Sequence, residues 1–322
     1  MKSSTLPAMG DYTRLDLSKA QQILRLYHDQ ELSQLIPLSL GISNSNYKVV
    51  LKSGEQLLLK VSNDKDHQQL LAEQSILNLL AELGYPFSLR ALGTKSGETV
   101  YNFEDFYGVL YPFIEGIPPG PSDVTCAEIG RALAKLHSLK FDSSEHSARS
   151  HEDVGFGPLK IKDYAQSVSA QKYFVDAYAR VFPEGVDHLA STELASGLIH
   201  GDLYYDNTLF QNENIAAVLD FEQAGLGEFI LDLGISISGT CLEKGLLHPG
   251  LIKSYLEGYE EVRPLPDNER ALMTDGICLG LFSIALWRIK RFTEGGLNPV
   301  LKDSYKDLLN KAIAYKEEND YE

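Results

Sequence analysis

A short segment rich in glycine and proline, Glu115-Gly-Ile-Pro-Pro-Gly-Pro121, separates two parts of the chain that have different hydrophobic patterns. Residues of this kind interrupt both helices and strands. Before the segment, apolar side chains alternate along residues 38–61 around two turns, which predicts antiparallel strands, and helical spacing over residues 64–83 predicts one helix. After the segment, apolar positions recur mainly at helical spacing.

We therefore predict an α+β fold with two lobes. Residues 1–114 are expected to form an N-terminal lobe built on an antiparallel sheet, with a hinge at about residues 111–117. Residues 115–322 are expected to form a larger, mainly helical lobe that carries a small central hairpin. Within this second lobe, the polar residues 142–163 predict a long connection without regular structure.

The composition limits the partners of this protein. Its 45 aspartate and glutamate residues outnumber 29 lysine and arginine residues, for a net charge of −16, which repels nucleic-acid phosphates and anionic lipid. Neither nucleic acid nor a membrane is therefore an expected partner. The most apolar stretch, residues 271–287, is interrupted by polar residues and predicts a buried core helix. The three cysteines form no Cys-x-x-Cys pair and the N-terminus lacks a signal-peptide core, which indicates a cytoplasmic protein.

The strongest chemical signal lies in Leu198-Ile-His-Gly-Asp-Leu-Tyr-Tyr-Asp-Asn-Thr-Leu-Phe210, followed by Ala217-Val-Leu-Asp-Phe-Glu222. An apolar run delivers Asp202 onto a loop, Asn207 follows five residues later, and a predicted hairpin returns Asp220 to the same end of the strands. Two carboxylates and a carboxamide around one point suit phosphoryl transfer. That reaction needs a group that orients the attacking hydroxyl and oxygen ligands for magnesium.

These residues resemble the kinase catalytic loop and, more closely, the pattern of the aminoglycoside phosphotransferase and choline kinase superfamily, His-x-Asp-x-x-x-x-Asn followed by a strand that ends in Asp. The resemblance implies a protein-kinase-like fold, ATP and Mg2+ as cofactors, and Asp202 as the catalytic base. It also implies that Asn207 and Asp220 hold the metal. In the same resemblance, His200 braces the loop and Asp232 stabilises it without reacting.

The N-terminal part contains residues that match the other half of such a site. Lys60 ends the apolar run Gln56–Val61 and resembles the strand lysine that contacts nucleotide phosphates. Glu73 follows thirteen residues later, on the predicted helix, where the family places the acid that pairs with this lysine. Taken singly, each residue would also suit a solvated strand end or helix face.

Two further segments are expected to contact the nucleotide. The turn that contains Ser43 and Asn44 sits where a hairpin should cover the phosphates, although it has one glycine in place of the G-x-G-x-x-G spacing of protein kinases. An ordinary polar turn explains those side chains nearly as well. The segment Leu110-Tyr-Pro-Phe-Ile-Glu-Gly116 resembles the hinge, where backbone groups of Tyr111 and Phe113 would read the adenine edge.

Two rivals share part of this pattern. Only eleven residues separate Asp220 from Asp232, which leaves no room for the activation loop and peptide platform of a protein kinase. A non-catalytic nucleotide-binding protein of the pseudokinase kind would usually lack the base, a metal ligand or the lysine, and all of these are present here.

The acceptor is predicted to be the hydroxyl of a small, amine-bearing molecule. Ordered motifs over roughly residues 35–292 most resemble phosphotransferase-type homoserine kinase. The chain departs from that subfamily in reading His-Gly-Asp for His-Ala-Asp and Asp-Phe-Glu for Asp-Phe-Tyr, so choline, ethanolamine and aminoglycosides remain alternative acceptors. Glu222 and Glu228, just past Asp220, are expected to favour an amine, as does the acidic composition.

Overall fold

The structure is a computed structural model that describes residues 13–38, 44–63, 65–142, 146–190 and 193–319. The chain separates into two compact units, which are described in turn. The first consists of Met1–Ala81 and Ser88–Ile114, and the second of Glu82–Phe87 and Glu115–Glu322. The short segment 82–87 therefore belongs with the second unit, although the sequence-based division counted it with the N-terminal lobe.

The first unit is built on a five-stranded antiparallel sheet in the order β1-β2-β3-β5-β4. Apolar side chains alternate along β2 and β3, so one face of each strand is buried in a common core. The helix α1 covers part of this core with Ala20, Ile23 and Leu24, which are fully buried. The elements are α1 (Leu17–Leu24), β1 (Leu32–Leu38), β2 (Asn44–Leu51), β3 (Gln56–Ser62), α2 (His67–Glu82), β4 (Tyr101–Phe103) and β5 (Phe106–Pro112).

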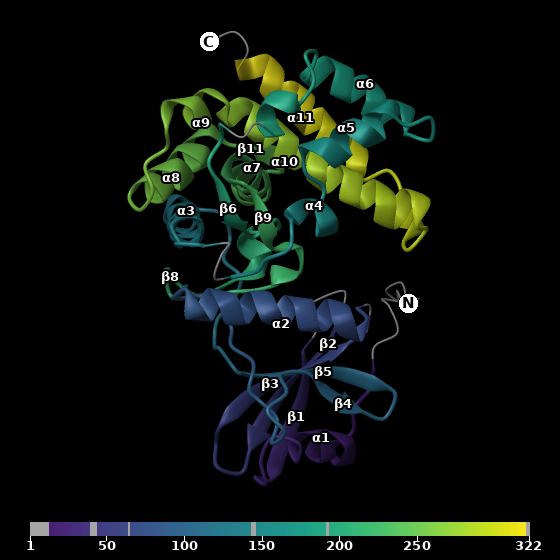
Figure 1. Ribbon diagram of the computed structural model, residues 1–322, viewed down its shortest axis with the longest axis vertical. Helices are drawn as coiled ribbons and strands as arrows, with labels where there is room; N and C mark the ends of the chain where they lie inside the picture. Colours follow the sequence, from purple (N-terminus) through teal and green to yellow (C-terminus); the bar gives the residue numbers. More distant parts are fainter. Residues whose placement is uncertain (1–12, 39–43, 64, 143–145, 191–192, 320–322) are drawn as a thin grey trace, which may run out of the picture. The chain divides into compact units, whose positions relative to one another are not determined.

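The second unit is mainly helical, and its central helices α7 (Phe229–Thr240) and α10 (Met273–Arg288) are almost entirely buried. These two helices cross very closely at Gly234 and Gly276. A Cβ on Gly234 would lie only 1.8 Å from the carbonyl oxygen of Gly276, so the crossing requires glycine. In Figure 1, α11 lies beside α7 and α10, and α10 packs against both α7 and α11. No helix in the described ranges is both long enough and apolar enough to cross a bilayer.

The remaining elements of the second unit surround these central helices. The helix α3 begins with a capping box between Ser122 and Thr125 and packs against α8. Three small antiparallel sheets pair β6 with β9, β7 with β8 and β10 with β11. The elements are α3 (Asp123–His137), α4 (His151–Val154), α5 (Pro158–Gln166), α6 (Lys172–Val181), β6 (Ser196–Ile199), β7 (Thr208–Gln211), β8 (Asn214–Val218), β9 (Gly225–Glu228), β10 (Leu242–Glu243), β11 (Leu246–Leu247), α8 (Pro249–Glu260), α9 (Asp267–Ala271) and α11 (Tyr305–Asn319).

The predicted fold class is confirmed. The predicted hairpin, the helix after Pro121 and the buried core helix are all present as β7–β8, α3 and α10. The prediction for residues 142–163 was wrong in part, because α4 and the first turns of α5 lie within that range. Pro158 occupies the first turn of α5, where its missing N–H costs no hydrogen bond.

Candidate active site

The loop between β6 and β7 holds the predicted base beside a predicted metal ligand. Asp202 follows two residues after His200, and Asn207 closes the short 3-10 turn Tyr205–Asn207. The carboxamide Nδ2 of Asn207 donates to the backbone oxygen of Asp202 at 2.8 Å and to its carboxylate Oδ2 at 3.1 Å. Since both bonds use the nitrogen, the oxygen Oδ1 of Asn207 is left to accept or to bind a cation.

Asp220 lies two residues after the end of β8 and has a left-handed backbone, with φ 60° and ψ 64°. Such a conformation is strained for a residue with a Cβ and persists where the surrounding structure imposes it. Two bonds impose it here: Leu219 N–H donates to the carbonyl of Asn207 at 2.8 Å, and the carbonyl of Leu219 is bonded to His200 Nε2 at 2.9 Å. His200 therefore braces the junction between the loop and Asp220.

The electrostatics of this loop favour a cation. Burial raises the pKa of Asp202 well above its usual range, and the negative charges of Asp220 and Glu222 act in the same direction. The bond from Asn207 opposes the increase only in part. A divalent ion would relieve this repulsion, and the hard oxygen atoms of Asn207 and Asp220 suit magnesium. Among the described residues, no group of three or more acidic, histidine or cysteine side chains could hold a metal alone, and magnesium in proteins usually completes its shell with water and substrate oxygens.

Asp232 holds the backbone at the start of the loop. Its fully buried carboxylate accepts hydrogen bonds from the N–H groups of His200 at 2.7 Å and Gly201 at 2.8 Å. The sequence predicted a supporting acid at this position. It did not predict that the ring of His137 also contacts this carboxylate, with Nε2 at 3.1 Å from Oδ2.

A second support, which sequence reasoning missed, comes from the start of α4 and the residues just before it. The Arg149 guanidinium donates to the carbonyl of Glu222 at 2.5 Å and to that of Ala224 at 3.0 Å, and His151 Nδ1 is bonded to the carbonyl of Gln223 at 2.8 Å. These contacts hold the turn that follows Asp220. They join segments about 70 residues apart, so no local spacing in the sequence predicts them.

This support also explains why glycine stands at position 201. Gly201 has φ +77°, and a Cβ there would lie 2.6 Å from Cε1 of His151 and 2.9 Å from the carbonyl oxygen of Gln223. The positive φ and the nearby His151 both favour glycine at this position of the His-Gly-Asp motif.

In the first unit, the predicted lysine and acid lie together, but they share a third partner. Lys60 Nζ lies 3.5 Å from Oε1 of Glu73, whereas Lys65 Nζ lies 2.8 Å from Oε2. The side chain of Glu73 is 3% exposed. Burial alone would raise the pKa of Glu73, but the two lysines outweigh it and lower the pKa to about 2. Lys65 was not predicted, because it lies in the short turn before α2 rather than on a strand.

The predicted hinge residues lie on and just after β5, but their backbone groups face the sheet. Phe113 N–H donates to the carbonyl of Gln56 at 3.1 Å. In an antiparallel pair every second residue forms such a bonded pair, so the backbone of Tyr111, opposite Leu58, also faces β3. The N–H of Phe113 is therefore engaged with β3, and the adenine contact of the Tyr111 and Phe113 backbones stays a prediction; by the same alternation we expect the carbonyl of Pro112 and the N–H of Ile114 to face away from β3.

The side chains of the two hinge residues are also engaged within the first unit. The hydroxyl of Tyr111 accepts a hydrogen bond from Gln74 Nε2 at 2.8 Å, and Lys48 lies over the Phe113 ring at 4.1 Å from its centroid. Of the predicted phosphate-covering turn, Ser43 lies outside the described residues. Asn44 begins β2 and is buried.

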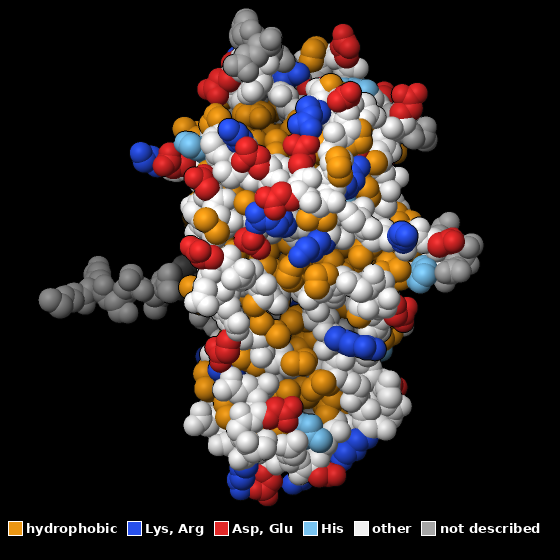
Figure 2. All heavy atoms as spheres, turned by 90° about the vertical axis from the view of Figure 1, so that its left-hand side faces the viewer, with side chains coloured by type: hydrophobic (Ala, Val, Ile, Leu, Met, Phe, Trp, Pro, Cys, Tyr) orange, Lys and Arg blue, Asp and Glu red, His pale blue; other side chains and the backbone are white. Residues whose placement is uncertain are grey.

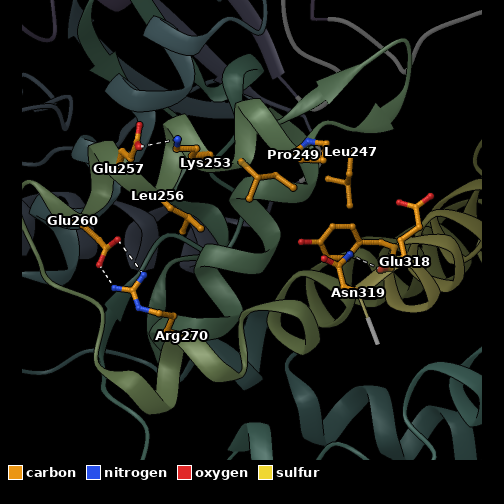
Figure 3. Close-up of a pocket in the computed structure, with 11 residues that line it drawn as sticks. Leu247, Pro249, Lys253, Leu256, Glu257, Glu260, Arg270, Glu318 and Asn319 are labelled. Atoms are coloured by element: carbon orange, nitrogen blue, oxygen red, sulfur yellow. Dashed lines mark hydrogen bonds and ion pairs between the residues drawn. The ribbon is translucent and has the colours of Figure 1, made fainter. Parts of the chain in front are cut away.

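A cavity of about 590 Å³ in the second unit contains none of the predicted site residues. It lies between α8 and the end of α11, and an ion pair between Glu260 and Arg270 and another between Lys253 and Glu257 border it (Figure 3). On the face of the molecule in Figure 2, acidic and basic side chains are interspersed.

Comparison with known proteins identifies the family. Residues 34–265 match the model of the phosphotransferase enzyme family APH. The chain belongs to this family. It is therefore a small-molecule kinase with a hydroxyl acceptor, and the predicted superfamily is confirmed.

Two similar proteins are both named homoserine kinase. The protein of Methylobacillus glycogenes is 27% identical over 323 residues, covering 96% of this chain and 98% of that protein. The protein of Gluconobacter oxydans (strain 621H) is 26% identical over 278 residues, covering 84% of this chain and 86% of that protein.

Solved structures confirm the fold. An amicoumacin kinase in complex with AMP-PNP, Ca2+ and Ami has a TM-score of 0.67 at 17% identity, covering 93% of this chain and 92% of that chain. A microcompartment-associated aminopropanol kinase has a TM-score of 0.66 at 19% identity, covering 94% of this chain and 97% of that chain. Both are small-molecule kinases, in agreement with the protein-kinase-like fold predicted from the sequence.

Proposed function

We propose that this kinase transfers the γ-phosphate of ATP, with Mg2+, to the hydroxyl of a small amino acid of the homoserine type. The observation that carries the proposal is the bond between Asn207 and Asp202, which fixes a carboxylate next to an amide oxygen able to bind a cation. The relatives named homoserine kinase, together with the solved kinase bound to AMP-PNP and Ca2+, support the choice of acceptor, nucleotide and divalent ion.

In this proposal each residue of the loop has a separate task. Asp202 orients the acceptor hydroxyl and takes its proton as the phosphoryl group is transferred. Asn207 and Asp220 hold the magnesium, which when bound neutralises charge on the phosphates. Asp232 and His200 keep the loop in shape. The bent backbone at Asp220 presents its carboxylate next to the loop, so a small change there would misplace a metal ligand.

The nucleotide contacts in the proposal come from the first unit. Lys60 binds phosphate oxygens, and Glu73 and Lys65 keep Lys60 in place by forming a buried charge cluster with it. Ser43 and Asn44 belong to the turn that covers the phosphates. The Pro112 carbonyl and the Ile114 N–H read the adenine edge, in place of the groups of Tyr111 and Phe113.

Two cations favour an acceptor that carries a carboxylate as well as an amine. Arg288 ends α10, where Nη1 donates to the carbonyl of Ser304 at 3.1 Å, and it interacts electrostatically with Tyr204, two residues after Asp202. Burial lowers the pKa of Lys311, and the like charge of Arg288 lowers it further. Asp307 is an acidic neighbour of both cations, so one excess positive charge remains that suits an anionic group, and Asp206 and Glu222 suit an amine.

The proposal is tested first on the catalytic groups. Asp202→Asn should lower kcat by about three orders of magnitude while the Kd for ATP changes only a few-fold, because the base acts in the transition state. Asp220→Ala should instead abolish the magnesium dependence of ATP binding measured by calorimetry. Near-normal turnover of Asp202→Asn, or magnesium-dependent binding that survives in Asp220→Ala, would refute the respective assignment.

The acceptor is tested by substrate comparison. ADP release should be fastest with homoserine among homoserine, choline, ethanolamine, aminopropanol and aminoglycosides. Arg288→Leu should raise the KM for homoserine by roughly tenfold, the value of one charged hydrogen bond, and leave the KM for aminopropanol unchanged, since aminopropanol has no carboxylate. If Arg288→Leu changes KM equally for both substrates, Arg288 does not bind the acceptor carboxylate. The kinase assignment would not be affected.

A further inference from the structure

A buried chain of hydrogen bonds continues outward from the acid that supports the catalytic loop. Asp232 contacts His137, the last residue of α3, whose Nδ1 lies 2.7 Å from the hydroxyl of Tyr259 on α8. Arg263 Nη1 donates to the same hydroxyl at 3.1 Å. Arg263 is in turn held by Glu269 through two bonds of 2.7 Å and 2.8 Å. Tyr259, Asp232 and Glu269 are each 0% exposed.

The chemistry of the groups orders the protons along this chain. The carboxylate of Asp232 only accepts, so His137 must carry its proton on Nε2. Arg263 only donates, so the hydroxyl oxygen of Tyr259 accepts from it, and the hydroxyl proton points to Nδ1 of His137. Every donor is then satisfied with a neutral imidazole. Burial lowers the pKa of His137, in agreement with the neutral form.

The surroundings strengthen each bond. The ring of Phe229 stacks on His137 at 4.1 Å between centroids and 11° between planes, and the guanidinium of Arg263 lies 4.8 Å from the centroid of the same ring. Aromatic walls exclude water, and an unpaired polar group in such a site is costly. The chain therefore has one low-energy proton arrangement.

We propose that His137, Tyr259 and Arg263 are positioning residues that fix Asp232, and through it the backbone of His200 and Gly201, for phosphoryl transfer. The proposal rests on the proposed role of Asp202, which follows Gly201 directly. These residues touch no reacting atom. They act by restricting the loop to one geometry, and misplacing a catalytic group slightly is enough to slow a reaction.

Two tyrosines one turn apart on α8 provide a matched test. Tyr255 is as buried as Tyr259, but its hydroxyl donates to Ser236 Oγ at 2.7 Å and takes no part in the chain of hydrogen bonds from Asp232 to Glu269. Tyr259→Phe should lower kcat about tenfold with KM for ATP and acceptor little changed, whereas Tyr255→Phe should keep kcat within about twofold, although each variant loses a fully buried hydroxyl group. Equal kcat values for the two variants would overturn the proposal.

The exchange of His137 separates positioning from bulk packing. His137→Gln retains an N–H donor for Asp232 and an oxygen acceptor for Tyr259, so it should recover most of the kcat that His137→Leu loses. If the leucine variant matches the glutamine variant in kcat, the ordered chain has no role in turnover.

A direct measurement does not depend on turnover. Nitrogen-15 spectra of histidine side chains in the wild-type protein, with the His137 signal assigned by its loss in His137→Gln, should show the neutral Nε2–H tautomer at pH 7. An imidazolium or the Nδ1–H tautomer would overturn the proposed proton order. If the wild-type protein phosphorylates none of the tested acceptors, the proposed function fails, and this spectrum still decides whether the chain exists.

Discussion

At the scale of single residues, Gly201 shows how a neighbour decides what a motif can contain. Its positive φ and its contact with His151 both exclude a side chain. We expect Gly201→Ala to lower the free energy of unfolding by about 3 kcal/mol and to lower kcat, because overlap with buried atoms adds to backbone strain.

Gly245 is the control for that change. It also has a positive φ, +81°, but nothing lies within 4 Å of its missing Cβ. Gly245→Ala should therefore cost only the strain, about 1 kcal/mol. Chemical denaturation compares the two variants, and equal losses would show that His151 does not restrict position 201.

Glu73 gives a prediction about pH. Because Lys60 and Lys65 lower its pKa from 4.5 to about 2, the folded state binds this proton less readily than the unfolded state. The stabilisation is fully present above pH 4.5 and is lost as the pH falls toward 2. Glu73→Gln should cost about 3 kcal/mol at neutral pH, since two buried lysines lose their acid, and should flatten the acid limb of the stability curve.

An exposed ion pair provides the control for Glu73→Gln. Lys52 and Glu31 form an ion pair with side chains 66% and 67% exposed. Glu31→Gln should leave the stability nearly unchanged, because solvent screens an exposed ion pair. Urea titrations between pH 2 and pH 7 make the comparison, and an unchanged acid limb in Glu73→Gln would contradict the charge cluster.

At the scale of elements, the outer edge of β5 decides which backbone groups can read a nucleotide. If Ile114 N–H binds adenine, Ile114→Pro should weaken binding of AMP-PNP roughly five- to tenfold, the value of one hydrogen bond. Ile114→Ala keeps the N–H and should bind as the wild type does. Calorimetry measures the affinity of both variants for AMP-PNP. If Ile114→Pro binds AMP-PNP as tightly as the wild type, Ile114 N–H does not contact adenine.

Helices and strands also differ in how well the local sequence predicts them. The strands β2 and β3 and the helix α3 were predicted because their apolar period and their turn or cap residues are local signals. The strand β1, Leu32–Leu38, was not predicted, since its burial pattern contains no fully buried position and it lies at the sheet edge. Its pairing with β2 decides its structure.

At the scale of the whole molecule, ligand binding should appear as stability. A ligand present at a hundred times its Kd stabilises a protein by about 2.7 kcal/mol, which corresponds to roughly 5 °C or more in Tm for a chain of this size. We expect ATP and Mg2+ together to raise Tm by this amount, and neither alone to do so. Scanning calorimetry measures the shift, and Asp220→Ala is the control that should lose it. A full shift with ATP alone would argue against a metal-dependent site.

The sequence by itself determined the α+β pattern, the two lobes and the group Asp202, Asn207 and Asp220. These features depend on residues close together in the chain, where hydrophobic period and motif spacing carry the information. The spacing from Lys60 to Glu73 was readable for the same reason.

Only the tertiary structure decided which partners those residues have. Glu73 is nearer Lys65 than Lys60 because the turn before α2 folds back on it, and the backbone of Phe113 is committed to Gln56 by the register of β5 on β3. Asp232 meets His137 from 95 residues away. Such contacts arise from the packing of distant segments, and burial makes each one matter, because an unpaired polar group in the core is costly whereas the same group on a solvated surface is not.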